Sequence, residues 1–115
     1  MRKFMKIVSK IDELNDIIQK NDFVFLYFSG ENCAVCKALK PKIEALFTLE
    51  FPFIQLIEIP TDKALEITAQ LGVFSLPTML LFVEQKEFLR KGRNVSLALL
   101  RDEVKRVYTL FFQKE

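Results

Sequence analysis

A single stretch of the sequence decides the fold: Phe23-Val24-Phe25-Leu26-Tyr27-Phe28-Ser29-Gly30-Glu31-Asn32-Cys33-Ala34-Val35-Cys36. Its first six residues are apolar on both faces of an extended strand, which is typical of a central strand covered by helices on both sides. A turn is expected at residues 29–32, and the apolar spacing that follows predicts a helix from about Cys33. The two cysteines therefore lie where a buried strand passes into a helix.

Outward from this stretch, short apolar runs alternate with segments of helical periodicity. Further strands are predicted at residues 4–8, 53–59, 78–83 and 88–91, and further helices at residues 11–18, 61–71 and 96–111. The resulting order, β-α-β-α-β-α-β-β-α, is typical of an α/β fold with a central mixed β-sheet flanked by helices on both faces. The 115 residues are enough for one hydrophobic core, so we expect residues 1–115 to form a single domain.

The composition excludes several kinds of chemistry. The chain has no histidine, which removes Ser-His and Cys-His nucleophile schemes and every metal site that needs imidazole. Two cysteines are too few for a four-thiolate zinc site within one chain, and a net charge of +2 is too small to indicate nucleic-acid binding. No apolar run approaches the roughly 20 residues that cross a bilayer, and none at the N-terminus suits a signal peptide. We therefore expect a cytoplasmic protein with no membrane partner.

The spacing of the two cysteines points to redox chemistry. At a helix N-terminus, unpaired backbone N–H groups and the helix dipole favour an anion at Cys33, and such sites lower a thiol pKa from about 8.5 to roughly 3.5–7.5. The offset of three residues places Cys36 one turn deeper, within reach of a disulfide and shielded from solvent. We therefore predict that Cys33 is the attacking thiol and Cys36 the resolving one. Half of a zinc or iron–sulfur site shared by two chains, or two structural core cysteines, remain as alternatives.

Four other residues lie at defined positions relative to the cysteine pair and to the last predicted helix. Lys37 directly follows it, Pro41 lies five residues after Cys36, Pro77 in Leu76-Pro77-Thr78 lies 41 residues after Cys36, and Gly92 precedes the last predicted helix. In these features and in the order of its elements, the sequence resembles the thioredoxin family over essentially its whole length. The resemblance implies a thioredoxin fold and exchange of a Cys33–Cys36 dithiol/disulfide with protein substrates.

The resemblance also implies a substrate groove and a set of partners. Its residues are Asn32, Ser75, Leu76, Pro77 and Gly92, with Pro77 in the cis form beside the disulfide and the Leu76 backbone offered to an extended substrate. A member of this family is expected to need no metal and no bound cofactor, to be a monomer, and to depend on a separate electron donor that regenerates the dithiol.

Several departures from the family pattern are specific to this chain. Asn32 replaces the usual Trp before the first cysteine, and Ala34-Val35 replaces the usual Gly-Pro, which changes the docking surface and the redox poise. Tyr27 stands where the family buries an aspartate beneath the disulfide, and Glu58 stands where it usually has a lysine. We therefore hypothesise that Glu58, with the Tyr27 hydroxyl as its partner, takes over proton transfer. The alternative is that Tyr27 is a core aromatic residue and that Glu58 reaches water at a strand end.

Two further features near the groove have open interpretations. Arg90, Lys91 and Arg93 surround Gly92, where they form either a solvated loop or a surface that attracts acidic partners. Phe74 either replaces part of the missing apolar docking surface or fills the core. Because the family's Trp, Gly-Pro and Asp are all missing, a redox-inactive or regulatory binding module is the alternative to an oxidoreductase.

Overall fold

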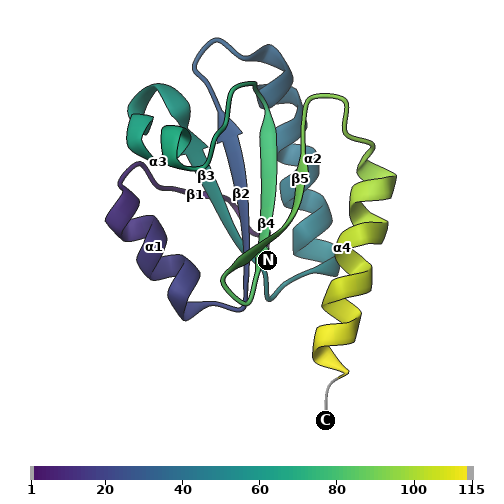
Figure 1. Ribbon diagram of the computed structural model, residues 1–115. Coiled ribbons are helices and arrows are strands. Elements are labelled where there is room, and N and C mark those ends of the chain that lie inside the picture. Colours follow the sequence, from purple (N-terminus) through teal and green to yellow (C-terminus); the bar gives the residue numbers. More distant parts are fainter. Residues whose placement is uncertain (1, 114–115) are drawn as a thin grey trace.

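Figure 1 shows the architecture in a computed structural model, which describes residues 2–113. The elements follow one another as β1 (Lys6–Ile7), α1 (Ile11–Lys20), β2 (Phe23–Ser29), α2 (Ala34–Glu50), β3 (Gln55–Pro60), the short 3-10 helix η1 (Thr61–Lys63), α3 (Leu65–Gln70), β4 (Thr78–Val83), β5 (Lys86–Lys91) and α4 (Leu97–Phe112). The predicted order of strands and helices is confirmed. No helix within residues 2–113 has the length and the apolar character needed to cross a lipid bilayer.

The five strands form one mixed sheet in the order β1-β3-β2-β4-β5. β3 pairs in parallel with β1 and β2, whereas β4 pairs antiparallel with β2 and β5. In Figure 1, α1 and α3 lie against one face of the sheet and α2 and α4 against the other. The predicted fold class, an α/β fold with a central mixed sheet flanked by helices on both faces, is therefore confirmed.

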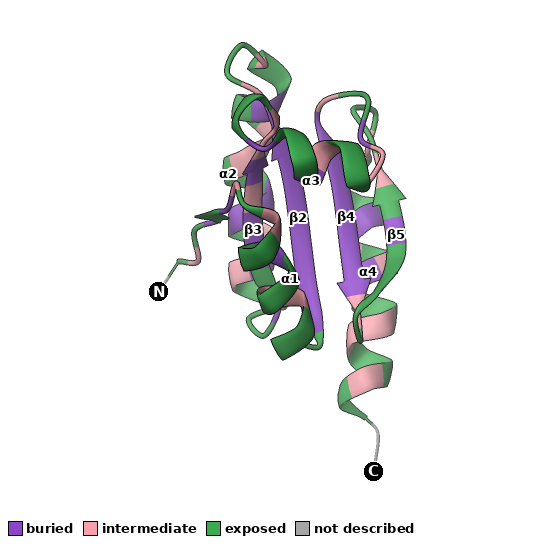
Figure 2. Ribbon diagram, turned by 60° about the vertical axis from the view of Figure 1, so that its left-hand side comes forward, coloured by how far each residue is buried: buried purple, intermediate pink, exposed green. Residues whose placement is uncertain are grey.

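The central position of β2 explains its sequence. All seven of its residues are buried, as Figure 2 shows. Because successive side chains of a strand point to opposite faces, β2 contributes to two cores. Phe23, Phe25 and Tyr27 join the cluster that contains Ile43 and Phe47 of α2 and Leu100 and Val104 of α4. Val24, Leu26 and Phe28 join the cluster that contains Leu14 of α1 and Ile67 of α3.

Several predicted element boundaries differ from the observed ones: β3 begins at Gln55 and not at residue 53, and β5 begins at Lys86 and not at residue 88. Side-chain hydrogen bonds accompany two further differences. β1 is shorter than the predicted residues 4–8, because the N–H of Met5 donates to Glu44 Oε2 at 2.9 Å and not to a neighbouring strand. The predicted helix at residues 61–71 divides into η1 and α3. Thr61 Oγ1 donates to the Ser29 carbonyl at 3.0 Å, which ties the start of η1 to the end of β2.

Candidate active site

The cysteine pair lies just beyond the end of β2, where the chain enters α2. Cys33 is the N-cap residue of α2, and its Sγ accepts a hydrogen bond from the backbone N–H of Cys36 at 3.2 Å. The two cysteines form a disulfide with their Cα atoms 5.2 Å apart, so the predicted pairing is present. Cys33 is half-buried and Cys36 is only 2% exposed. A partner therefore has access to Cys33 and not to Cys36.

The first turns of α2 are built with fewer internal hydrogen bonds than a regular helix. The helix starts in the ordinary way, since the N–H of Lys37 donates to the Cys33 carbonyl at 3.2 Å. Pro41 lies inside α2 and has no N–H, so it cannot donate to the carbonyl of Lys37 four residues earlier. The turn that follows Cys36 therefore has one internal hydrogen bond fewer than a regular helix, and contacts from outside α2 add to those that remain.

Tyr27 of β2 supplies one of these outside contacts. Its side chain is fully buried, and its hydroxyl donates to the backbone carbonyl of Cys36 at 2.7 Å. Burial and, to a smaller extent, the negative charge of Glu58 raise the pKa of Tyr27, so the hydroxyl keeps its proton and its donor role across the physiological range. The structure differs here from the expectation that this hydroxyl is the partner of Glu58, because its one proton is directed at Cys36.

Glu58 of β3 lies beside Tyr27 in the parallel pairing with β2, and it is held from two other directions. Its Oε2 accepts a hydrogen bond from Ser29 Oγ at 2.7 Å, and its Oε1 lies 2.6 Å from Lys40 Nζ. Oε1 is buried and receives no well-aligned hydrogen bond, so the positive charge of Lys40 is what balances it. The side chain of Glu58 is only 14% exposed, and it lines an open pocket.

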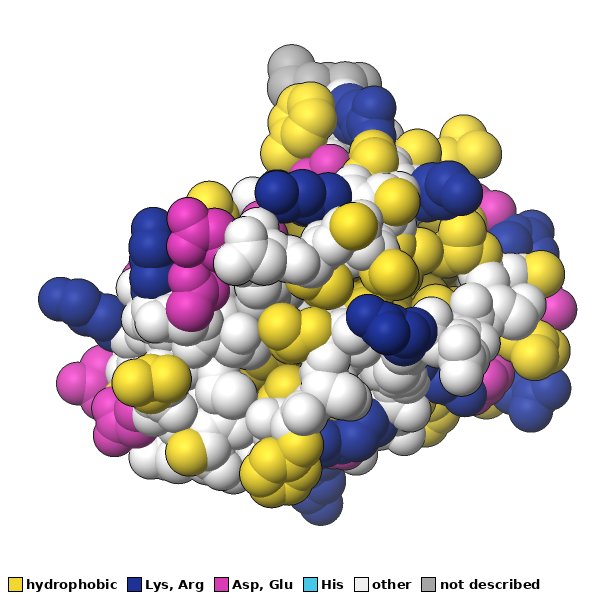
Figure 3. Space-filling view, turned by 90° about the horizontal axis from the view of Figure 1, so that it is seen from above, with side chains coloured by type: hydrophobic (Ala, Val, Ile, Leu, Met, Phe, Trp, Pro, Cys, Tyr) yellow, Lys and Arg dark blue, Asp and Glu magenta, His cyan; other side chains and the backbone are white. Residues whose placement is uncertain are grey.

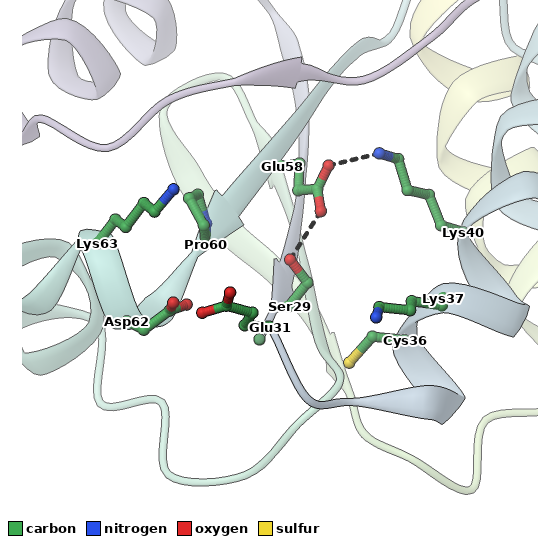
Figure 4. A pocket seen from close by; sticks show the side chains of 10 residues that line it. Ser29, Glu31, Cys36, Lys37, Lys40, Glu58, Pro60, Asp62 and Lys63 are labelled. Atoms are coloured by element: carbon green, nitrogen blue, oxygen red, sulfur yellow. Dashed lines mark hydrogen bonds and ion pairs between the residues drawn. The ribbon is translucent and has the colours of Figure 1, made fainter.

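Figure 4 shows the pocket that Glu58 shares with the buried cysteine. It has a volume of about 380 Å³, with Cys36 entering from α2 and Glu58 from β3. The other charged side chains that line it are Glu31, Lys37, Lys40, Asp62 and Lys63. Acidic and basic groups thus face one another around a space large enough for water, close to the resolving cysteine.

The second loop of the site carries the proline of the predicted groove. The peptide bond between Leu76 and Pro77 is cis, and Pro77 is buried. Leu76 approaches the turn before Cys33 so closely that a Cβ added to Gly30 would lie 2.7 Å from Leu76 Cδ1. Only glycine fits at position 30 without moving Leu76. This contact places the proline loop directly against the cysteine turn.

The remaining predicted groove residues lie on either side of these two loops. Ser75 and Gly92 line a pocket of about 230 Å³ next to the proline loop, and Asn32 is exposed in the cysteine turn. A Cβ added to Gly92 would meet no atom within 4 Å, so the chain leaves the space over this glycine open. The predicted residues thus occur at one end of the molecule, and their role in substrate binding stays a prediction.

The described residues offer little to a metal ion. Within residues 2–113, no three His, Cys, Asp or Glu side chains gather closely enough to hold one. The thiols that a site shared by two chains would use are joined to each other in the disulfide.

Sequence reasoning missed two residues of the site, Lys40 and Ser29, and named Tyr27 with another partner. Lys40 and Ser29 hold the Glu58 carboxylate, and the Tyr27 hydroxyl holds the Cys36 backbone. Lys40 lies four residues after Cys36, which is one turn further along the same helix face. That spacing was the one available signal. Nothing in the sequence indicates that Glu58 is the acid it meets.

The fold and the site define a class of protein: a mixed sheet between helices, with a joined CxxC pair at a helix N-terminus beside a cis proline. The sequence model of the thioredoxin family, described as Thioredoxin, matches residues 5–106. The chain therefore belongs to the thioredoxin family. Family membership and the close cysteine pair together indicate thiol–disulfide exchange.

Individual relatives agree with this assignment. The chain is 34% identical over 109 residues to the thioredoxin-like protein YdfQ of Bacillus subtilis, a match that covers 95% of this chain and 96% of the relative. It is 36% identical over 86 residues to the thioredoxin of Chlamydia muridarum, covering 75% and 81% of the two chains. Among solved structures, Fasciola hepatica thioredoxin superposes with a TM-score of 0.80 at 26% identity, covering 89% of this chain and 98% of the other.

Proposed function

We propose that this protein is a thiol–disulfide oxidoreductase that exchanges its Cys33–Cys36 pair with disulfides of protein substrates. The position of Cys33 carries the proposal. Its Sγ is partly exposed, caps a helix of 17 residues, and receives the N–H of Cys36. In the reduced protein, this N–H and the helix dipole favour the thiolate, which is the reactive form of a cysteine.

The reaction divides into two exchanges. The Cys33 thiolate attacks one sulfur of the substrate disulfide, so that a Cys33–substrate bond forms, the substrate S–S bond breaks, and the other substrate sulfur leaves as a thiolate. Cys36 then loses its proton and attacks Cys33 Sγ, which forms the Cys33–Cys36 disulfide and releases the second substrate thiolate. Two electrons pass from the protein to the substrate, and a separate electron donor must return them.

For the second exchange we propose that Glu58 accepts the proton of Cys36 through water in the shared pocket. The support is its position: the carboxylate faces the pocket that Cys36 lines, and Lys40 and Ser29 fix its orientation. Cys36 is buried, so it forms a thiolate less readily than Cys33 and gains more from a nearby base.

The proposal extends to the setting of the reaction. We place this activity in a single-domain monomer in the cytoplasm, because paired cysteines in that reducing compartment are more often catalytic than structural. Its partners are protein disulfides, and the electron donor is a protein or small thiol that reduces the exposed Cys33 side of the disulfide.

The first prediction tests the asymmetry between the two cysteines. In the reduced protein, iodoacetamide at about pH 7 should alkylate Cys33 many-fold faster than Cys36, as measured by quenched mass spectrometry, because only Cys33 is accessible and stabilised as an anion. Cys36→Ser should accumulate mixed disulfides with oxidised insulin, whereas Cys33→Ser should accumulate few.

Turnover provides the control for this prediction. With a dithiol reductant present, the unaltered protein should reduce insulin over many cycles, whereas neither Cys33→Ser nor Cys36→Ser should do so. Equal alkylation of the two cysteines together with no turnover would contradict the proposal and would favour the redox-inactive binding module.

The second prediction concerns Glu58. Glu58→Gln should slow the release of substrate from a Cys33 mixed disulfide by about 3- to 30-fold near pH 6, since a positioned base is lost while the contact with Ser29 can persist. The difference should shrink as the pH rises past the ordinary thiol value of about 8.5, where Cys36 ionises without help. Stopped-flow mixing of a preformed mixed disulfide measures this rate.

Asp62→Asn is the matched control, because it removes the same charge from the rim of the same pocket. It should leave the release rate close to that of the unaltered protein. A Glu58→Gln rate equal to the control at every pH would remove the base role and leave Glu58 as the partner of Lys40 alone.

A further inference from the structure

One aromatic side chain near the disulfide is left almost entirely in water. Phe74, in the loop before the cis proline, is 94% exposed, more than any other large hydrophobic side chain in the described part of the chain. The alternative that Phe74 fills the core is therefore wrong. Its ring lines the 230 Å³ pocket that also contains Ser75 and Gly92. A single exposed hydrophobic side chain is common on protein surfaces, so the position of Phe74 in the pocket beside Ser75 and Gly92, and not its exposure alone, points to a docking contact.

The three cations around Gly92 differ in how far they are already used. The Arg90 guanidinium is fully engaged, since it binds the Glu87 carboxylate and donates to the carbonyls of Leu71 at 2.7 Å and Gly72 at 3.2 Å. Arg90 thereby clamps β5 to the loop that leads into Phe74. Lys91 forms an ion pair with Glu103 at 2.8 Å. Two of the three cations thus belong to the structure of the site.

Arg93 is the cation that the fold does not use. It is exposed, directly follows Gly92, and has neither an ion pair nor a hydrogen bond of its side chain with another residue in the range 2–113. Figure 3 looks onto this end of the molecule and shows hydrophobic side chains gathered across it, with Lys and Arg side chains set among them. A partner that contacts both Phe74 and Arg93 would need an apolar group and a negative charge.

We propose that Phe74 and Arg93 select the substrate. They favour protein disulfides in which a reactive cysteine has an apolar side chain and an acidic side chain within a few residues. The occupant of the surface is the substrate segment around that cysteine, which passes over the open space at Gly92. The inference rests on the proposed function and adds a substrate class to it. Because Arg90 holds the loop in place, the surface is formed before the substrate arrives.

Short peptides provide the test. Each contains one cysteine and is used as its symmetrical disulfide-linked dimer, so that attack at either sulfur gives the same products. The reduced protein and one dimer yield the Cys33–Cys36 disulfide and two peptide thiols. One pair of peptides has Glu or Lys beside the cysteine, and a second pair has Leu or Ser. Alkylation of the thiols at set times, followed by mass spectrometry, gives the rate at which each peptide dimer is reduced.

In the unaltered protein, the Glu peptide should react about fivefold faster than the Lys peptide at low salt, and this ratio should fall as salt is added. Arg93→Glu should invert the ratio and Arg93→Ser should abolish it. Lys105→Glu changes the net charge equally on α4 and should keep the ratio. Phe74→Ala should remove the preference for Leu over Ser, whereas Phe88→Ala, at another exposed aromatic residue, should keep it.

The reaction with bis(2-hydroxyethyl) disulfide, which is small and uncharged, distinguishes a failure of the substrate preference from a failure of the proposed function. If the unaltered protein reacts with this probe but treats all peptides alike, the substrate preference is overturned and the proposed function stands. A preference that Lys105→Glu alters as much as Arg93→Glu also overturns it. If the protein reacts with neither the probe nor the peptides, both proposals are overturned.

Discussion

The two ends of β2 are equally buried, yet they are built from different interactions. At its first residue, Phe23 meets the rings of Tyr108, Phe111 and Phe112 of α4, with centroids 5.5, 5.0 and 5.9 Å away. At its other end, the hydroxyls of Tyr27 and Ser29 donate to the Cys36 carbonyl and the Glu58 carboxylate. Burial alone therefore does not separate the two ends.

The two ends of β2 differ in the kind of contact that their buried side chains make. The Phe23 end contributes apolar area and ring contacts, which stabilise the fold without favouring one chemical state. The Tyr27 end directs one hydroxyl at the Cys36 carbonyl, in a helix that lacks one of its own hydrogen bonds, and the other at Glu58, which lines the same pocket as Cys36. One end of β2 therefore mainly stabilises the fold, whereas the other end orients groups of the candidate active site.

The largest expected effect on this comparison comes from Phe23→Ala. Removing a fully buried ring should lower the free energy of unfolding by about 3–5 kcal/mol, as measured by urea denaturation. Alkylation of Cys33 in the folded protein should stay at its original rate, because the ring lies at the opposite end of β2. Phe74→Ala makes the same chemical change at an exposed ring and should alter stability by less than about 0.5 kcal/mol.

If Phe23→Ala is too unstable to be studied in its folded form, Phe23→Leu provides a milder change that should also lower the free energy of unfolding. A clear change of the Cys33 alkylation rate in the folded Phe23→Leu protein would contradict the division of β2 into two regions.

A smaller effect is expected from Tyr27→Phe, which removes a single buried donor. The unfolding free energy should fall by about 1–2 kcal/mol, because the Cys36 carbonyl loses its bond from the hydroxyl. Resolution of the mixed disulfide by Cys36 should also slow, since the segment that carries this cysteine is held less firmly. Single-turnover kinetics separate this step from the attack by Cys33.

Tyr108→Phe is the matched change at the other end of the sheet, where the hydroxyl accepts the N–H of Phe53 at 3.2 Å. It should lower stability by up to about 1 kcal/mol and leave the resolution step unchanged. Equal slowing in the two variants would show that the Tyr27 hydroxyl acts through stability alone.

The smallest effect is expected at the turn between β4 and β5. Glu84 and Gln85 both have positive φ, at 49° and 70°, a conformation that costs an L-residue about 1 kcal/mol more than it costs glycine. Gln85→Gly should therefore raise the unfolding free energy by about 0.5–1 kcal/mol, and neither cysteine should change in reactivity. Thermal denaturation measures the gain. Lys86→Gly, one residue later in β5, should lower stability and serves as the control.

The sequence predicts most reliably the features that depend on near neighbours. The two-faced apolar run at residues 23–28 is β2, the periodic stripe after Cys33 is α2, and Cys33 lies at the helix N-terminus. Each of these follows from residues within two helical turns of one another. The cis form of Pro77 is different, because it was expected from the family resemblance and not from local preference.

Features that join distant parts of the chain were not predictable in the same way. The link from Met5 to Glu44 spans 39 residues, and it shortens β1 by using a donor that the strand pattern assigns to the sheet. The direction of the Tyr27 hydroxyl depends on where α2 packs, which no spacing within β2 reveals. The exposure of Phe74 likewise depends on the path of a loop, so its two interpretations were equal until the fold was known.

The two glycines of the site differ in how substitutions at their positions affect folding. At Gly30 a Cβ would lie 2.7 Å from the Cδ1 atom of Leu76, so the Leu76 side chain, next to the cis proline, must move to admit any substitution. At Gly92 a methyl group meets empty space, so selection for folding does not detect the change. Under the proposed function, the substrate that passes over this space is what requires a glycine at position 92. A mutant library sorted by expression level should therefore diversify freely at position 92 and less at position 30, whereas a library sorted by turnover on a protein disulfide should favour glycine at both.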